Sequence, residues 1–120
     1  MSKFKDQILK ILENEPRVRV VEENTRITDI FIKGMEENEA WACYDNNEDE
    51  IRINGEIRLK FDYKDVWINS DYSYDCSIKI RTVKKFKKYL NMALGLSAIF
   101  EQATKQIKNL QKLDRIEDDF

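Results

Sequence analysis

An acidic run, residues 36–50, is the first stretch of this chain whose side chains could bind or react with something. It contains seven Asp and Glu residues and no Lys or Arg. Clustered carboxylates attract a basic partner, and they imitate the phosphates of nucleic acid. The alternative is a solvated hairpin loop with no partner. The candidate partner-binding residues in this run are Asp45, Glu48, Asp49 and Glu50.

Twelve residues that begin within this run resemble the calcium-binding loop of the EF-hand family. The oxygen ligands would come from Asp45, Asn47, Asp49 and, at the twelfth place, Glu56. The EF-hand loop needs glycine at its sixth place for a sharp turn, and this chain has Glu50 there. Arg52 stands where the loop carries a hydrophobic residue, and the flanking residues are typical of strands. We therefore predict no metal site and no cofactor.

A basic run lies where a predicted strand leads into a predicted helix. Free amide N–H groups at a helix N-terminus attract anions. Tyr72 and Tyr74 precede the run, and aromatic residues beside basic ones are typical of single-stranded nucleic-acid sites. A protein contact or a solvated helix face would also explain the run. It consists of Lys79, Arg81 and the candidate partner-binding residues Lys84, Lys85, Lys87 and Lys88.

The sequence offers little to a catalytic mechanism. It contains no histidine, which is the usual general base near neutral pH and the commonest metal ligand. Its three glycines are scattered, and its two cysteines, Cys43 and Cys76, do not form a CxxC pair. We predict that the protein is not an enzyme. Two free thiols, with no signal peptide or membrane-spanning run, predict a cytoplasmic location.

The middle of the chain is predicted to form an antiparallel sheet of five to seven strands, flanked by an N-terminal helix and a long C-terminal helix. The N-terminal helix covers residues 2–15 and ends before Pro16. The runs 51–53 and 57–63 both alternate apolar with polar residues, so they are predicted to pair as a hairpin around Asn54-Gly55. This order of elements predicts an α+β fold. The other predicted strands are residues 17–23, 25–33, 39–44, 66–68 and 72–81.

The C-terminal helix is predicted over residues 82–113, with Thr82 as its cap. Lysines crowd its first two turns and acidic residues follow its end, which is the reverse of what the helix dipole favours. At about 100° per residue, its apolar residues fall on two faces that differ by roughly a third of a turn and change over at Gly95. The first face has Val83, Phe86, Leu90, Ala93 and Leu94. The second has Leu96, Ile99, Phe100, Ala103, Ile107, Leu110 and Leu113.

The length of this helix leaves two alternatives. A continuous helix would be about 48 Å long, whereas a compact chain of this size has a radius of gyration of about 14 Å. The helix either breaks at Gly95 and folds back, or its second half projects and meets a partner. Because its lysines come first and its acids last, it complements a second copy of itself in the antiparallel direction. We predict a homodimer through Leu96, Phe100, Ala103 and Ile107.

These patterns predict one α+β domain over residues 1–113 and a frayed acidic tail over residues 114–120. The predicted function is non-enzymatic docking on another macromolecule, with a protein favoured over nucleic acid and no membrane. The acidic, Lys-, Asn- and Ile-rich composition is typical of a phage or mobile-element inhibitor or regulator of a host protein. The alternatives are a nucleic-acid-binding regulator that uses the Lys79–Lys88 run and a dimeric assembly or chaperone factor.

Overall fold

The computed structural model describes residues 3–35, 40–54, 57–62, 64–70 and 77–118. Within them, an N-terminal helix, antiparallel strands and a long C-terminal helix confirm the predicted α+β fold. The elements are α1 (Lys3–Glu13), β1 (Val18–Glu22), β2 (Ile27–Ile32), β3 (Ala42–Asp45), β4 (Glu50–Asn54), β5 (Ile57–Phe61), β6 (Val66–Ser70), β7 (Ser77–Ile80) and α2 (Val83–Asp118).

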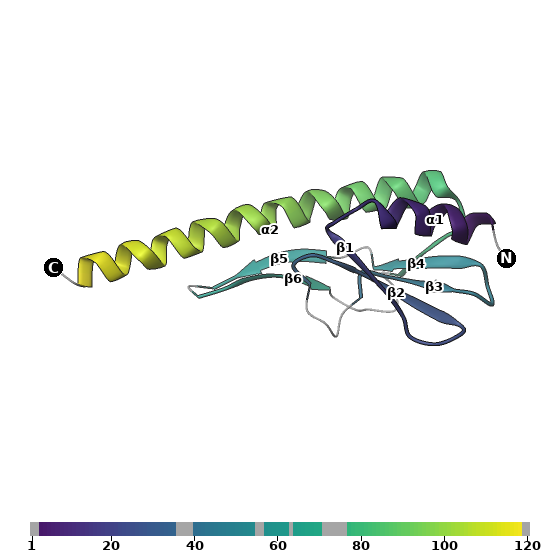
Figure 1. The fold of residues 1–120 in the computed structure, drawn as a ribbon, viewed down its shortest axis with the longest axis horizontal. Helices are drawn as coiled ribbons and strands as arrows, with labels where there is room; N and C mark the ends of the chain where they lie inside the picture. The colour runs from purple at the N-terminus through teal and green to yellow at the C-terminus, as the bar shows by residue number, and fades with distance from the viewer. Residues whose placement is uncertain (1–2, 36–39, 55–56, 63, 71–76, 119–120) are drawn as a thin grey trace.

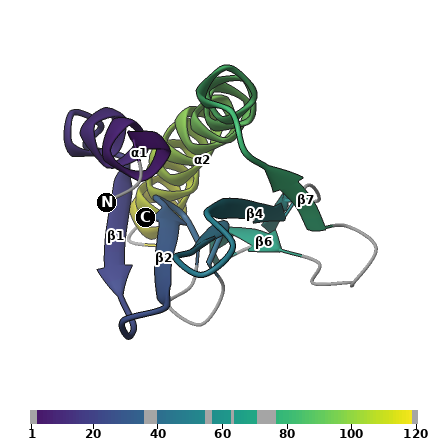
Figure 2. The same ribbon diagram turned by 90° about the vertical axis from the view of Figure 1, so that its right-hand side faces the viewer.

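These strands form two antiparallel sheets. The larger sheet has the order β1-β2-β3-β4-β7, and the smaller one pairs β5 with β6. Both helices lie over the same face of the larger sheet, and the distal part of α2 continues over the smaller one (Figure 1). The end-on view shows α1 above the β1 edge and the connection from β7 rising into the start of α2 (Figure 2).

The predicted pairing of runs 51–53 and 57–63 is wrong. β4 lies between β3 and β7, so that Ile51 faces Tyr44 on one side and Ile80 on the other. Both backbone edges of β4 are therefore occupied, and β5 pairs with β6 instead. The alternation predicts the buried face of β4 correctly, because Ile51 is fully buried, but it fails at Phe61 of β5, which is 73% exposed. Alternation does not choose the neighbouring strand, and that choice was the error.

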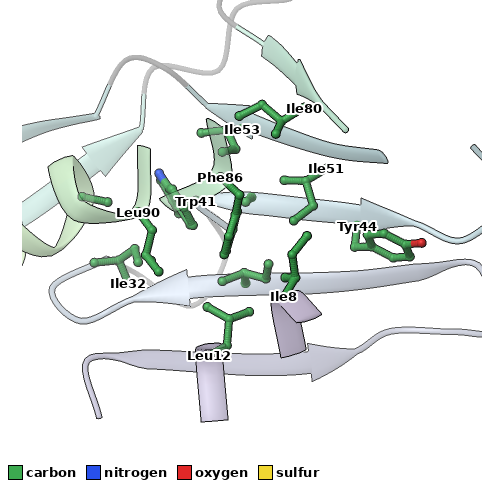
Figure 3. Close-up of a cluster of buried hydrophobic side chains, with 13 residues drawn as sticks. Ile8, Leu12, Ile32, Trp41, Tyr44, Ile51, Ile53, Ile80, Phe86 and Leu90 are labelled. Carbon is green, nitrogen blue, oxygen red and sulfur yellow. The ribbon is translucent and has the colours of Figure 1, made fainter. Parts of the chain in front are cut away.

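The core lies between the larger sheet and the two helices (Figure 3). Ile8 and Leu12 of α1 are four residues apart and therefore share one helix face. Phe86 of α2 is fully buried against Trp41, with ring centroids 6.1 Å apart. Full burial of each such side chain stabilises the fold by about 1.5–3 kcal/mol. The other labelled core residues are Ile32, Tyr44, Ile51, Ile53, Ile80 and Leu90.

α2 is one continuous helix, and the break considered at Gly95 is absent. A Cβ atom added at Gly95 would have nothing within 4 Å, so glycine is not required there for a close contact. Glycine in a helix interior costs only about 1 kcal/mol relative to alanine, which is less than the packing on either side supplies. The fold is elongated, with extents of 64 × 30 × 25 Å and a radius of gyration of 17.1 Å. α2 also continues beyond residue 113, where the predicted domain ends.

The end of β2 joins the two sheets beneath the distal part of α2. Gly34, at a φ of 106°, accepts a hydrogen bond from the Ile68 N–H of β6 at 2.8 Å. The Phe100 ring of α2 lies directly against Gly34, because an added Cβ there would come within 2.8 Å of it. Ser97, which is fully buried, donates its hydroxyl to the Lys33 carbonyl at 2.8 Å. Glycine is therefore needed at position 34 for both its backbone angle and its lack of a side chain.

Candidate docking surfaces

Two of the four acidic candidates are buried structural groups. The side chains of Asp45 and Glu50 are 5% and 3% exposed, and they lie opposite each other on β3 and β4. Arg26 donates two hydrogen bonds to Asp45, at 3.3 and 3.2 Å. Glu50 accepts hydrogen bonds from Arg52 at 3.1 Å and from Arg81 at 3.2 Å. The spacing within the acidic run could not predict these pairs, because Arg26 and Arg81 come from other parts of the chain.

In these ion pairs the arginines are the members exposed to solvent, and the carboxylates are buried. The hydrogen bond from Arg26 lowers the pKa of Asp45, although burial of the carboxyl acts in the opposite direction. Hydrogen bonding to Glu50 raises the pKa of Arg52. The arginine side chains stay 45–66% exposed. Asp45 therefore ties β3 to the start of β2, and Glu50 ties β4 to the end of β7. Neither carboxylate presents an acidic docking surface to a partner.

Glu48 and Asp49 are the two acidic candidates that reach solvent. They lie in the turn 46–49, which joins β3 to β4 as a hairpin. The Tyr44 hydroxyl donates a hydrogen bond to Asp49, whose φ is 49°. Asp45 caps the same turn by accepting the Asn47 N–H at 2.9 Å. Over the residues with described positions, no three metal-ligating side chains gather, and Glu56 of the EF-hand-like spacing lies outside them.

The four lysine candidates are all exposed at the start of α2. Thr82 caps this helix as predicted, because its hydroxyl oxygen accepts the Lys85 N–H at 3.4 Å. The first turn contains no acidic residue to offset the lysines. Lys79 is exposed, whereas Arg81 is paired with Glu50. The candidate nucleic-acid surface is therefore accessible, and its binding of nucleic acid stays a prediction.

Cys43 lies on the outer face of the larger sheet, opposite the helices. Its strand neighbours are Asp29 and Arg52. Burial raises the pKa of the Cys43 thiol to about 11, and the charge of Asp29 adds to this effect. A thiol with a raised pKa is a poor nucleophile at neutral pH. Cys43 is a free cysteine, as predicted, and Cys76 lies outside the described residues.

One shallow hollow lies at the β1–β2 end of the molecule, with a volume of about 260 Å³. Its wall includes Phe31, whose ring is covered by the Arg19 guanidinium at 4.5 Å from the centroid. Arg17 and Lys33 also line it, and both are paired with Glu101. Small-molecule sites are usually larger, at about 300–1,000 Å³, and gather unpaired polar groups. This hollow therefore offers no catalytic arrangement.

The side of α2 nearest β1 is fastened by charged contacts. Glu101 accepts a hydrogen bond from Arg17 at 3.0 Å and forms an ion pair with Lys33 at 3.3 Å. The Arg17 hydrogen bond is the main cause that lowers the pKa of Glu101, and the Lys33 bond is the next. Further along the helix, Gln111 donates a hydrogen bond to the Lys64 carbonyl at 3.3 Å. These contacts set which way the remaining faces of α2 point.

The opposite side of α2 carries apolar side chains that the described part of the fold leaves exposed. Their exposed fractions are 64% for Met92, 52% for Ile99, 62% for Leu110 and 56% for Leu113. At about 100° per residue, Leu110 lies half a turn around the helix from Glu101. Half-buried Leu96 and Ala103 fall between the exposed residues. We call this surface the outer stripe: Met92, Leu96, Ile99, Ala103, Leu110 and Leu113.

The outer stripe changes the predicted dimer surface. Leu96 and Ala103 belong to it, whereas Phe100 packs on Gly34 within the same chain. Ile107 is half-buried on the flank between the two. Met92 was missed, because the sequence pattern grouped the apolar residues on either side of Gly95. Counting in steps of four and three residues from Met92 would have found it, since that spacing runs unbroken through Gly95.

Comparisons with protein-family models, with curated proteins and with solved structures found no match for this chain. Neither helix of the described chain has a stretch both long and apolar enough to cross a bilayer. Among the surfaces described, the outer stripe is the one with several apolar side chains exposed to solvent, at Met92, Ile99, Leu110 and Leu113.

Proposed function

We propose that this chain is a non-enzymatic binding protein that docks on another protein through the outer stripe of α2. The observation that supports the proposal is the exposure of Met92, Ile99, Leu110 and Leu113 along one side of a continuous helix. Isolated exposed apolar residues are common on protein surfaces, but a contiguous stripe rimmed by polar residues is typical of an interaction site. Recognition of a helix by a groove or by another helix uses this spacing of anchors.

The alternatives have weaker support. Asp45 and Glu50 are committed to arginines within the fold, so an acidic docking surface is reduced to Glu48 and Asp49. Nucleic-acid binding through the exposed lysines would weaken as salt is added. A filter-binding assay at low salt in which the protein retains no DNA or RNA would exclude it. Inhibition or regulation of a host protein, in the cytoplasm, is one form that protein docking could take. That form rests on composition and stays a prediction.

Site-specific photocrosslinking in the cells that make the protein tests the proposal. A benzophenone amino acid at Ile99 or at Leu110 is expected to give discrete protein adducts on a denaturing gel. The matched control is the same amino acid at Lys105, which is exposed on the same helix segment and lies more than a third of a turn from Leu110. Equal adduct yields from Lys105, or no discrete adduct from the outer stripe, would contradict docking through this surface.

A further inference from the structure

The geometry points to a second copy of this chain, bound in the antiparallel direction, as the partner of the outer stripe. This inference rests on the proposed function and names its partner. With Gln106 included, the stripe follows steps of four, three, four, three, four and three residues: Met92, Leu96, Ile99, Ala103, Gln106, Leu110 and Leu113. That spacing keeps a row of side chains on the seam between two helices over three heptads, about 32 Å of helix.

Charge selects the direction of the second helix. The first two turns of α2 carry four exposed lysines and no acidic residue in the first turn. The sequence of its last turns contains three acids, Asp114, Glu117 and Asp118, beside two bases, Lys112 and Arg115, and the helix continues to Asp118. A parallel pair would bring like charges together at both ends. An antiparallel pair brings each basic end level with an acidic end, which also offsets the unfavourable position of both charge groups on the helix dipole.

The seam also selects one register. Met92 lies level with Leu110 of the second copy, and Ile99 with Ala103. Leu113 lies level with Tyr89, which is half-buried and packs in part against the core of its own chain. The same register brings Lys85 level with Glu117 and Lys88 level with Asp114. A shift of one heptad in either direction is worse, because it sets Met92 against Glu117 or Lys85 against Leu110. Only the pairing of Leu96 with Gln106 is mixed, and a single polar seam position is a known way of specifying register.

The rest of the described fold leaves room for this second helix. Arg17 and Lys33 hold α2 at Glu101, about half a turn from the centre of the stripe. Phe100 and Ser97 face the body, where they contact Gly34 and Lys33. Helices pack with their axes about 8–10 Å apart, and Met92 and Leu110 near the two ends of the seam are both more than 60% exposed. The interface therefore forms without opening the core.

Sedimentation equilibrium across low to high micromolar concentrations tests the second copy. We expect a dimer, and we expect Leu110→Glu to raise its dissociation constant by about 100-fold, as a charge buried within an interface does. Lys105→Glu is the control and should leave the dissociation constant within about twofold. Circular dichroism should show that both variants keep their helix content. A monomer at high micromolar concentration would overturn the inference.

A charge swap tests the direction and the register. Lys85→Glu alone and Glu117→Lys alone should each weaken the dimer by about tenfold, because each change replaces two attractive pairs with repulsive ones. The double variant should recover the wild-type dissociation constant. A partner other than a second copy would not produce this recovery. Additive weakening in the double variant would overturn the register.

Two measurements, the oligomeric state and the crosslinked adducts, separate self-association from docking on a different protein. If the chain is monomeric but the outer stripe still crosslinks to a different protein, the second copy is wrong and protein docking stands. If the chain is monomeric and the outer stripe gives no adduct, both are wrong. Spin labels at Asn109 in a background with Cys43→Ser and Cys76→Ser add a direct distance. The antiparallel register places the labelled residues about 24 Å apart along the helix axis, and a parallel pair would place them side by side.

Discussion

The two sides of α2 carry similar apolar residues but have different surroundings. The inner side places Phe86, Leu90 and Ala93 against the sheet, at 0–3% exposure. The outer side places Met92, Ile99, Leu110 and Leu113 in solvent, and each is more than 50% exposed. Both sides run through Gly95 on one continuous helix. The difference shows that apolar periodicity finds both surfaces, whereas only burial tells which one the chain itself uses.

The largest expected effect comes from the inner side. Phe86→Ala should lower the free energy of unfolding by about 3–5 kcal/mol, because it opens a cavity beside Trp41. Urea unfolding followed by tryptophan fluorescence measures it. Met92→Ala is the outer-side control and should stay within about 0.5 kcal/mol at protein concentrations where the chain is monomeric. Equal losses from the two variants would erase the distinction between the two sides.

The next effect concerns Gly34, where the end of β2 contacts both β6 and Phe100. Gly34→Ala should lower the free energy of unfolding by about 2–4 kcal/mol. The new Cβ would lie 2.8 Å from the Phe100 ring and 2.9 Å from the Ile68 side chain, at a φ of 106°. Hydrogen exchange should show that the amides of β5 and β6 lose more protection than those of β2 and β3. If the free energy of unfolding did not change, Phe100 would have to move aside at little cost.

Gly95→Ala should act in the opposite direction. It should raise the free energy of unfolding by about 0.8–1 kcal/mol, because alanine restricts the unfolded chain and an added Cβ meets nothing within 4 Å. Thermal unfolding of Gly34→Ala and Gly95→Ala side by side gives the comparison. A loss of stability at position 95 would indicate that α2 needs a weak point there, which its continuous course does not suggest.

The smallest effect concerns the contact that fastens α2 near β1. Arg17 and Lys33 lower the pKa of Glu101 in the folded chain, so this carboxylate stabilises the fold above its unfolded pKa. That contribution is lost as the pH falls through the lowered value. Glu101→Gln should therefore reduce the melting temperature slightly at pH 7, and the difference from wild type should shrink below about pH 4.5. A difference that is constant with pH would show that the ion pairs contribute nothing.

The sequence was sufficient for the fold class, the two helices and the buried face of β4. α1, Lys3–Glu13, lies within the predicted residues 2–15, and Thr82 caps α2 as expected. The neighbour of β4 could not be predicted, because alternation marks a face and pairing depends on which edges are already occupied. The sequence left open whether α2 breaks at Gly95, because the cost of that glycine is local and the packing that outweighs it comes from distant residues.

The candidate site was harder to predict than the fold. Asp45 and Glu50 looked like surface groups, since the arginines that bury them approach from other parts of the chain. Phe100 looked like an interface residue, since the backbone of Gly34 that receives it lies far earlier in the chain. In both cases the missing information was a contact between distant segments. The positions of the outer-stripe residues, by contrast, follow from local helical spacing, whereas their exposure is known only from the structure.

The unbroken course of α2 gives the helix a fixed rotational phase. Each residue turns the chain by about 100°, so the direction of Phe86 sets the direction of Leu110, about seven turns further along. A single residue inserted after Gly95 would keep the composition of the helix and its apolar residues. It would nevertheless swing Phe100 off Gly34 and turn the outer-stripe residues from Leu96 to Leu113 by about 100° relative to Met92. The number of residues in α2 therefore sets the direction in which the outer stripe points, just as their identity sets its chemistry.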